Sequence, residues 1–154
     1  MATIRRSKPS DIEQVLSLTK DFSTSFAPAR PVFVEAFARL ATREDAVLLV
    51  AEDSSRVVAY LLGVDHDTLF ANGRVSWVEE VMVHQEYRRR GIGKRLMQEF
   101  ERWAESRQSR LVALATRRAS HFYKALGYEE SATYYRKPVG RRAHHPISPS
   151  LESG

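Results

Sequence analysis

The stretch that decides the fold is EYRRRGIGKRLM, residues 86–97, in which three arginines stand directly before a Gly-x-Gly. Residues 75–83, VSWVEEVMV, have the composition of a buried strand, and apolar residues recur at helical spacing from Leu96 onward. A strand therefore leads through a basic turn into a helix. The first N–H groups of a helix have no intrahelical partner, and glycine lets a ligand approach the backbone. The junction thus predicts an anion site suited to a pyrophosphate, against the simpler interpretation of a turn with a solvated basic rim.

Two common phosphate-loop patterns do not fit the spacing. A dinucleotide fingerprint needs a third glycine at position 96, which is leucine, and a Walker A loop needs glycine at 88 and serine or threonine at 95, which are both arginine. An R-x-x-G-x-G pattern remains. Permanent positive charge surrounds it, from Arg88, Arg89, Arg90, Lys94 and Arg95.

The rest of the chain predicts alternating strands and helices. Strands are expected at 3–7, 46–53, 57–65, 75–83, 110–116 and 132–137, the last being ATYYRK, with RLVALAT at 110–116 buried. A first helix is expected to begin at a capping box formed by Ser10 and Glu13, and a second, shorter helix is expected around Phe33 and Phe37. A third helix is expected from Gly91 or Gly93 to about residue 107. A fourth is expected over 117–128, where Gly127 would end it in a left-handed conformation. The order predicts an α/β (α+β) domain with a mixed, partly antiparallel sheet.

Composition limits the classes of protein. The 154 residues, 17.6 kDa, predict one domain over 1–137, followed by a tail at 138–154 that holds three of the six prolines and is expected to be mobile. The absence of cysteine excludes disulfides, thiolate metal sites and a cysteine nucleophile. No apolar run approaches the roughly 18 residues of a membrane span, and the N-terminus lacks the apolar core of a signal peptide, so we expect a cytoplasmic protein with no membrane partner.

The net charge of +5 suits an anionic partner, with cations concentrated from Arg88 to Arg142. Nucleic acid is disfavoured because the sequence shows neither a recognition helix nor an aromatic stacking pattern. The histidines, including His84, His121 and the pair at 144–145, have no metal-ligand spacing, so we expect no metal.

Two motifs in the expected order make the chain resemble the GNAT superfamily of acetyl-CoA-dependent N-acetyltransferases. VEEVMVHQEYRRRGIGKRLM, residues 78–97, resembles the acetyl-CoA signature of that superfamily, and ASHFYKALGY, residues 119–128, resembles its second hallmark helix. The resemblance covers roughly residues 3–137. It implies a mostly antiparallel sheet flanked by helices on both faces, with a splayed pair of central strands.

The resemblance also implies how acetyl-CoA would bind. Backbone amides from Arg88 to Lys94 would hold the pyrophosphate. The pantetheine arm would pair with the strand backbone at Val81, Met82 and Val83. Thr116 stands where the family often has an asparagine that contacts the pantetheine. The cofactor-binding set is then Val81, Met82, Val83, Arg88, Arg89, Arg90, Gly91, Ile92, Gly93, Lys94 and Thr116.

Acetyl transfer to an amine needs a base for the ammonium and an acid for the departing thiolate. The strand carboxylates Glu79 and Glu80 are the candidate bases, and strand alternation places them on opposite faces. Glu79 is favoured, on a face with Trp77, Val81 and Val83, while the other glutamate is expected to ion-pair structurally. By the resemblance, Tyr123 is the acid, against the alternative of a core aromatic.

The acceptor predicted from the resemblance is a primary amine, most simply a small one, attacked in a ternary complex. A protein N-terminus or lysine is the alternative substrate, and a non-catalytic acyl-CoA-binding module is the alternative class. The acceptor pocket would lie at residues 22–37 and 66–74, whose Phe26, Phe33, Phe70, Arg30 and Asp67 suit a cationic amine with an apolar portion. A homodimer is a further expectation from the resemblance.

Overall fold

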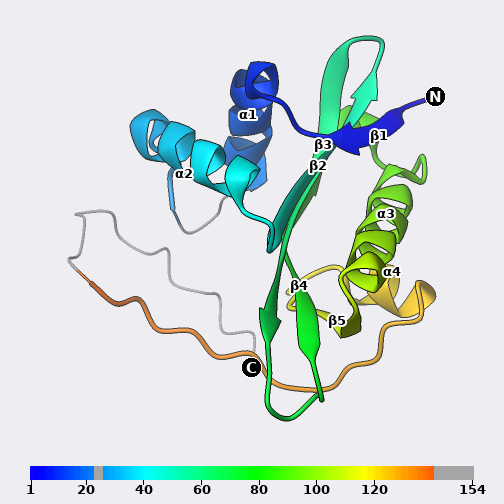
Figure 1. Ribbon diagram of the computed structural model, residues 1–154. Helices are drawn as coiled ribbons and strands as arrows, with labels where there is room; N and C mark the ends of the chain where they lie inside the picture. The colour runs from blue at the N-terminus through cyan, green and yellow to red at the C-terminus, as the bar shows by residue number, and fades with distance from the viewer. Residues whose placement is uncertain (23–25, 141–154) are drawn as a thin grey trace, which may run out of the picture.

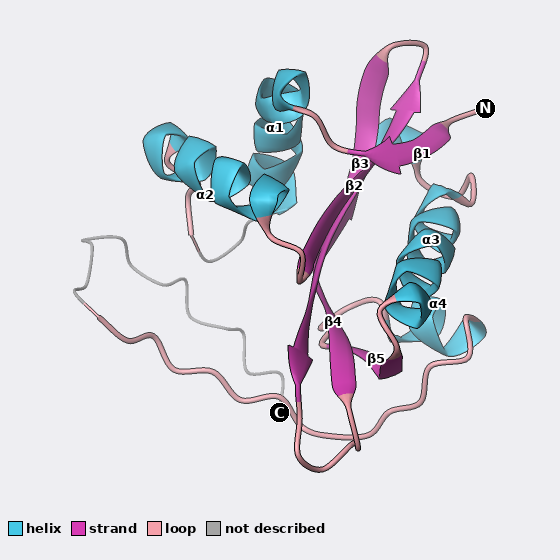
Figure 2. Cartoon of the chain, in the orientation of Figure 1, coloured by secondary structure: helices cyan, strands magenta, loops and turns pink. Residues whose placement is uncertain are grey.

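The computed structural model describes residues 1–22 and 26–140, and shows a sheet with helices packed on both faces (Figures 1 and 2). The strands β1 (Thr3–Arg6), β2 (Ala46–Asp53), β3 (Arg56–Asp67), β4 (Arg74–Val83) and β5 (Ser109–Leu114) are hydrogen-bonded in chain order. The first three pairings are antiparallel and β4–β5 is parallel. The predicted mixed and mostly antiparallel sheet is therefore confirmed.

The helices divide the core into two layers. α1 (Ile12–Phe22) and α2 (Arg30–Thr42) cover one face of the sheet, and α3 (Ile92–Ser106) and α4 (Ser120–Ala125) lie on the other (Figure 1). The α1/α2 layer is built on fully or nearly buried side chains that include Val15, Leu18, Phe37, Val50, Tyr60 and Met82. The α3 layer includes Leu61, Val78, Leu96, Met97, Phe100 and Trp103. The second helix, at 13 residues, is longer than the first, contrary to the sequence prediction.

The first helix begins differently from the predicted capping box. A short 3₁₀ turn, Pro9–Asp11, precedes α1, and the carboxylate of Asp11 accepts the N–H of Lys8 at 2.8 Å. Asp11 is only 2% exposed and accepts two further hydrogen bonds from the Arg5 guanidinium, at 2.8 and 2.9 Å. Glu13 is exposed and pairs with Arg30 instead. The buried aspartate replaces the predicted serine–glutamate pair because it satisfies the helix start and Arg5 together.

Two predictions about the C-terminal half are wrong. β5 is partly exposed rather than buried, with Leu111 42% accessible, because it forms the edge of the sheet in the described chain. Residues 132–137 form no strand; Tyr134 and Tyr135 are 60% and 87% exposed, and the chain runs past the lower end of the sheet (Figure 1). Strand-forming composition needs a partner edge, and this segment takes none. Residues 141–154 of the predicted tail lie outside the described residues.

β4 carries two irregularities. Its register with β3 shifts between the pairs Leu62–Glu80 and Gly63–Val78, so Glu79 is an extra residue in a β-bulge. Its pairing with β5 ends at Val78–Leu114, although β4 continues to Val83. The ladder between β4 and β5 therefore ends together with β5, next to the bulge, where the resemblance implies a splayed strand pair.

Candidate functional site

The turn between β4 and α3 has a backbone suited to an anion. Arg89 and Gly91 both lie in the left-handed region, with φ of 63° and 78°. The first backbone bond into the helix is from Arg95 N–H to the Gly91 carbonyl at 3.1 Å. Among the described residues, the N–H groups of residues 92–94 have no acceptor, so they form a concave set of donors at the positive end of the helix dipole.

The two glycines of the turn have different surroundings. A Cβ on Gly91 would meet nothing within 4 Å, whereas a Cβ on Gly93 would lie 3.3 Å from Cζ of Phe122 on α4. Gly91 thus leaves open space in front of the donors, and Gly93 lets α4 pack closely against the start of α3. The Ile92 side chain is 5% exposed, so it anchors the helix in the core and leaves its backbone for a ligand.

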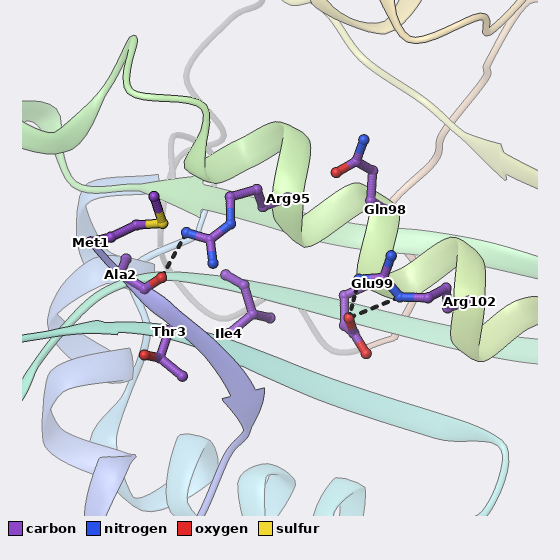
Figure 3. A pocket seen from close by; sticks show the side chains of 8 residues that line it. All are labelled: Met1, Ala2, Thr3, Ile4, Arg95, Gln98, Glu99 and Arg102. Atoms are coloured by element: carbon purple, nitrogen blue, oxygen red, sulfur yellow. Dashed lines mark hydrogen bonds and ion pairs between the residues drawn. The ribbon is translucent and has the colours of Figure 1, made fainter.

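The predicted ring of positive charge is only partly formed. Arg88, Arg89, Arg90 and Lys94 are exposed around the turn. Arg90 lies over the ring of Tyr87 at 5.0 Å, and Nε of Arg88 donates to the Val83 carbonyl at 3.1 Å. Arg95 points elsewhere: its guanidinium donates to the carbonyl of Ala2 on the side of β1 (Figure 3). The inclusion of Arg95 in the site was therefore wrong.

The edge of β4 beyond Val78 is the second element of the site. Val81, Met82 and Val83 pair with β3 on one side, while the ladder to β5 has already ended on the other. Unpaired strand backbone offers N–H and C=O groups to any extended ligand. This edge leads through a short 3₁₀ turn, Gln85–Tyr87, to the donors at the start of α3.

The bulge changes the faces predicted for β4. Val78 packs with Val81 and Val83 in the α3 layer. Trp77 precedes Val78 in the strand and therefore lies on the opposite face of the sheet, where it pairs with Val64 of β3. The predicted grouping of Glu79 with Trp77, Val81 and Val83 is therefore wrong. Strict alternation fails because the strand contains one residue more than its partner.

The two strand carboxylates have distinct environments. Glu80 is half-buried on the α1/α2 side, where Oη of Tyr60 donates to its Oε1 at 2.9 Å. Burial raises the pKa of Glu80; the Tyr60 hydrogen bond lowers it in part, and the charge of Glu79 raises it. Glu79 is exposed, and partial desolvation raises its pKa while His66 lowers it in part.

Tyr123 lies on the other side of the sheet from Glu80. Its ring contacts Phe122 and Tyr128 edge-to-face, at centroid distances of 4.9 and 5.9 Å, and packs against the α3 layer. Burial raises the pKa of the Tyr123 hydroxyl, which makes no hydrogen bond within the described chain. A neutral O–H is therefore held against the α3 layer without an acceptor in the described part of the chain.

Thr116 has a local structural contact. Its hydroxyl oxygen accepts the N–H of Ala119 at 3.0 Å, at the turn that enters α4. The hydroxyl hydrogen stays available, so Thr116 can still donate one hydrogen bond to a ligand.

The residues predicted for the acceptor pocket are mostly paired with one another or packed. Phe33 packs on Phe37 at 6.1 Å, and Asp67 lies 3.8 Å from Arg74. Arg30 pairs with Glu13, as described above. Phe26 and Phe70 are 65% and 80% exposed, while residues 23–25 of the predicted segment lie outside the described residues.

One surface pocket lies away from these groups. It has a volume of about 490 Å³ between β1 and α3 and is lined by residues such as Ile4, Arg95, Gln98 and Arg102 (Figure 3). None of the candidate catalytic residues lines it. Within residues 1–22 and 26–140, no three His, Asp or Glu side chains gather as metal ligands, and no helix has the length and apolarity of a bilayer span.

The main polar partner that sequence reasoning missed is Tyr60. In VVAYLLGVD it looks like one more core aromatic of a buried strand. The available signal was its hydroxyl, since a tyrosine in a run of aliphatic residues needs a buried hydrogen-bond partner.

Residues 12–128 match the model of the acetyltransferase (GNAT) family. Among solved structures, the transcriptional regulator from Bacillus halodurans C-125 is 24% identical, with a TM-score of 0.81 over 90% of this chain and 100% of that chain. Glucosamine-6-phosphate N-acetyltransferase from Arabidopsis thaliana is 18% identical, with a TM-score of 0.81 over 91% and 99%. AAC(6')-Iy, in complex with the bisubstrate analogue CoA-S-monomethyl-acetylneamine, is 20% identical, with a TM-score of 0.76 over 90% and 99%. These structures show the shared fold. A comparison with curated proteins gives no match.

Proposed function

This chain belongs to the acetyltransferase (GNAT) family, and from that premise we propose that it transfers an acetyl group from acetyl-CoA to a primary amine. The observation that carries the proposal is the continuity of the unpaired β4 edge with the N–H donors of the Arg88–Lys94 turn. An extended arm ending in a pyrophosphate matches that continuity in both shape and charge.

The residues fit acetyl-CoA in four respects. The backbone at Val81, Met82 and Val83 would pair with the amides of the pantetheine arm, which would take the place of the Arg88 Nε at the Val83 carbonyl. The donors at the start of α3 would hold the pyrophosphate, in the space that Gly91 leaves open. Exposed Arg88, Arg89, Arg90 and Lys94 would add charge at the turn, and Thr116 would donate its hydroxyl hydrogen.

The chemistry would use groups from both faces of β4. Bound acetyl-CoA supplies a thioester activated toward amines. A strand carboxylate accepts a proton from the ammonium, and the freed amine attacks the thioester carbonyl directly in a ternary complex, in agreement with the absence of cysteine. Tyr123 then donates its proton to the sulfur as the C–S bond breaks, and the proton that the attacking nitrogen still carries returns to the Tyr123 phenolate, so the products are an amide and CoA. The amine would enter from the α1/α2 side, where Glu80 lies, and the thiolate would leave toward Tyr123.

For the acceptor we propose a small amine with an apolar portion. The charged side chains of the candidate pocket are engaged in ion pairs, Arg30 with Glu13 and Asp67 with Arg74. The ring of Phe70, which is 80% exposed, therefore offers an apolar surface there to an incoming molecule.

The test is acetyl-CoA-dependent release of free thiol, detected with a disulfide dye, across polyamines, amino acids, amino sugars, aminoglycosides and short peptides. The protein has no cysteine and contributes no background. We expect release with one class of amine, together with acetyl-CoA binding by calorimetry. Binding without release from any amine would contradict acetyl transfer and favour a binding module, and absence of binding would overturn the proposal.

A further inference from the structure

Three polar side chains from three different elements meet in the α1/α2 layer. Tyr60 of β3 donates through Oη to Oε1 of Glu80 on β4 at 2.9 Å, and Oγ1 of Thr19 on α1 lies 3.2 Å from the same Oη. Thr19 also lies 2.8 Å from the Val15 carbonyl, and its one hydrogen can serve either contact. A chain of hydroxyls thus joins the first helix to the strand carboxylate.

The surroundings show that Tyr60 is there for more than packing. Its side chain is 2% exposed and packs in the same layer as Val15, Leu18, Val50 and Met82. A phenylalanine would fill nearly the same volume. A phenol in such a layer is costly unless the hydroxyl has a partner, and the partner here is the carboxylate of Glu80.

The same contact distinguishes the two neighbouring glutamates. Glu80 is half-buried and has one oxygen fixed by Tyr60, while its Oε2 accepts no hydrogen bond from the described residues. Glu79 occupies the bulge, is exposed, and has no hydrogen-bond partner in the described chain. Two adjacent carboxylates in different environments can take different protonation roles.

We propose that Tyr60 is a positioning residue that selects Glu80, rather than Glu79, as the proton acceptor, by fixing Oε1 and leaving Oε2 for the substrate ammonium. The inference rests on the proposed acetyl transfer and assigns its base. Thr19 holds the far side of the phenol, which ties the orientation of the carboxylate to the helix that covers this face.

The groups around Glu80 make the inference testable by titration. Tyr60 from β3 stabilises the carboxylate and lowers its pKa, while Glu79 on β4 raises it. His66 of β3 acts on Glu79. The charged residues of α1 and α2 are exposed, and none hydrogen-bonds to Glu80: Glu13, Lys20, Asp21, Arg30, Glu35 and Arg39. Two substitutions should therefore move the Glu80 titration in opposite directions.

The experiment compares wild type, Tyr60→Phe and Glu79→Gln. The Glu80 carboxyl titration is followed by carbon NMR of glutamate-labelled protein, with Glu80→Gln assigning the signal, and the pH profile of kcat/KM is measured with the active amine. Tyr60→Phe should raise the pKa of Glu80 by about one pH unit, because the hydrogen bond to the charged carboxylate is lost. The acidic limb of the kcat/KM profile should move up by the same amount. Glu79→Gln should move both down by about half a unit, and by less at high salt.

Tyr134→Phe is the matched control, since it removes a phenol hydroxyl from a side chain that is 60% exposed. It should change neither curve, and KM for acetyl-CoA should stay within about twofold in every variant. An unchanged Glu80 titration in Tyr60→Phe overturns the inference. A shifted titration with an unshifted rate limb also overturns it, while leaving acetyl transfer intact. A wild-type protein that acetylates no amine removes the proposed function and the inference together.

Discussion

The ring of Phe100 fills the space beside Gly63, because a Cβ on this glycine would lie 2.1 Å from Cε2 of that ring. Phe100 is fully buried on α3, and Gly63 faces Val78 at the β4 bulge. The helix that begins with the donor turn is therefore seated on the sheet at the point where β4 leaves β5.

Gly63→Ala should destabilise the protein by about 1–3 kcal/mol, since the added methyl group overlaps a ring that has no free volume to move into. Urea unfolding followed by circular dichroism measures the change. Phe100→Leu should restore part of the loss when combined with Gly63→Ala, and strictly additive effects of the two substitutions would argue against the steric explanation.

Gly91→Glu should abolish acetyl-CoA binding in calorimetry, because a side chain and a negative charge enter the space in front of the helix donors. The matched control is Gly140→Glu, which replaces another left-handed glycine, φ 91°, with nothing within 4 Å of its added Cβ. The control carries the same backbone strain and charge and should bind normally. Normal binding by Gly91→Glu would place the phosphates elsewhere.

Tyr123→Phe should lower kcat at least about tenfold, because the departing thiolate loses its proton donor, while acetyl-CoA affinity stays within about threefold. Steady-state rates and calorimetry measure the two quantities separately. Tyr128→Phe removes a hydroxyl from the ring that packs on Tyr123, and should leave kcat within about threefold. Equal rates for wild type and Tyr123→Phe would remove this tyrosine from the mechanism.

Because of Asp11, the free energy of unfolding should depend on pH in the acidic range. Burial by itself would raise the pKa of Asp11, but the hydrogen bonds from Arg5 and from the Lys8 N–H outweigh it, so the net pKa is lowered. A lowered folded-state pKa gives stability that is present above the unfolded value, near 4, and is lost as the pH falls through the folded value.

Asp11→Asn should therefore cost roughly 1–3 kcal/mol at pH 7 and less as the pH falls through the lowered pKa of the wild-type carboxylate. Urea midpoints from pH 2 to 7 measure the difference. Asp45→Asn is a control on an exposed carboxylate paired with Arg43 and should change stability little. A cost for Asp11→Asn that is independent of pH would show that shape, rather than charge, matters at this position.

The sequence predicts those parts of the fold that depend on local periodicity. Leu96, Met97 and Phe100 recur at helical spacing, and α3 follows them from Ile92 to Ser106. The strands from β2 to β4 also follow their apolar runs, and Gly127 has the predicted left-handed conformation at φ 94°. These elements are governed by neighbours within a few residues.

The errors occur where the outcome depends on distant residues. The composition of residues 132–137 suits a strand, but no edge of the sheet pairs with them. Arg95 looks like part of the basic turn until the carbonyl of Ala2, 93 positions away, proves to be its partner. The Tyr60–Glu80 contact spans two strands and depends on register, which side-chain alternation gives wrongly once a bulge is present.

Because of the bulge, Glu79 could be deleted from β4 without moving the other side chains of the strand to the opposite face of the sheet. Val78 and Glu80 already face the partners they would have as consecutive residues, Gly63 and Leu62. A chain that lacked Glu79 would keep every other side chain of β4 on its present face and would lose only the local bend. The bend of β4 is thus set by the length of the strand, through one surplus residue opposite β3.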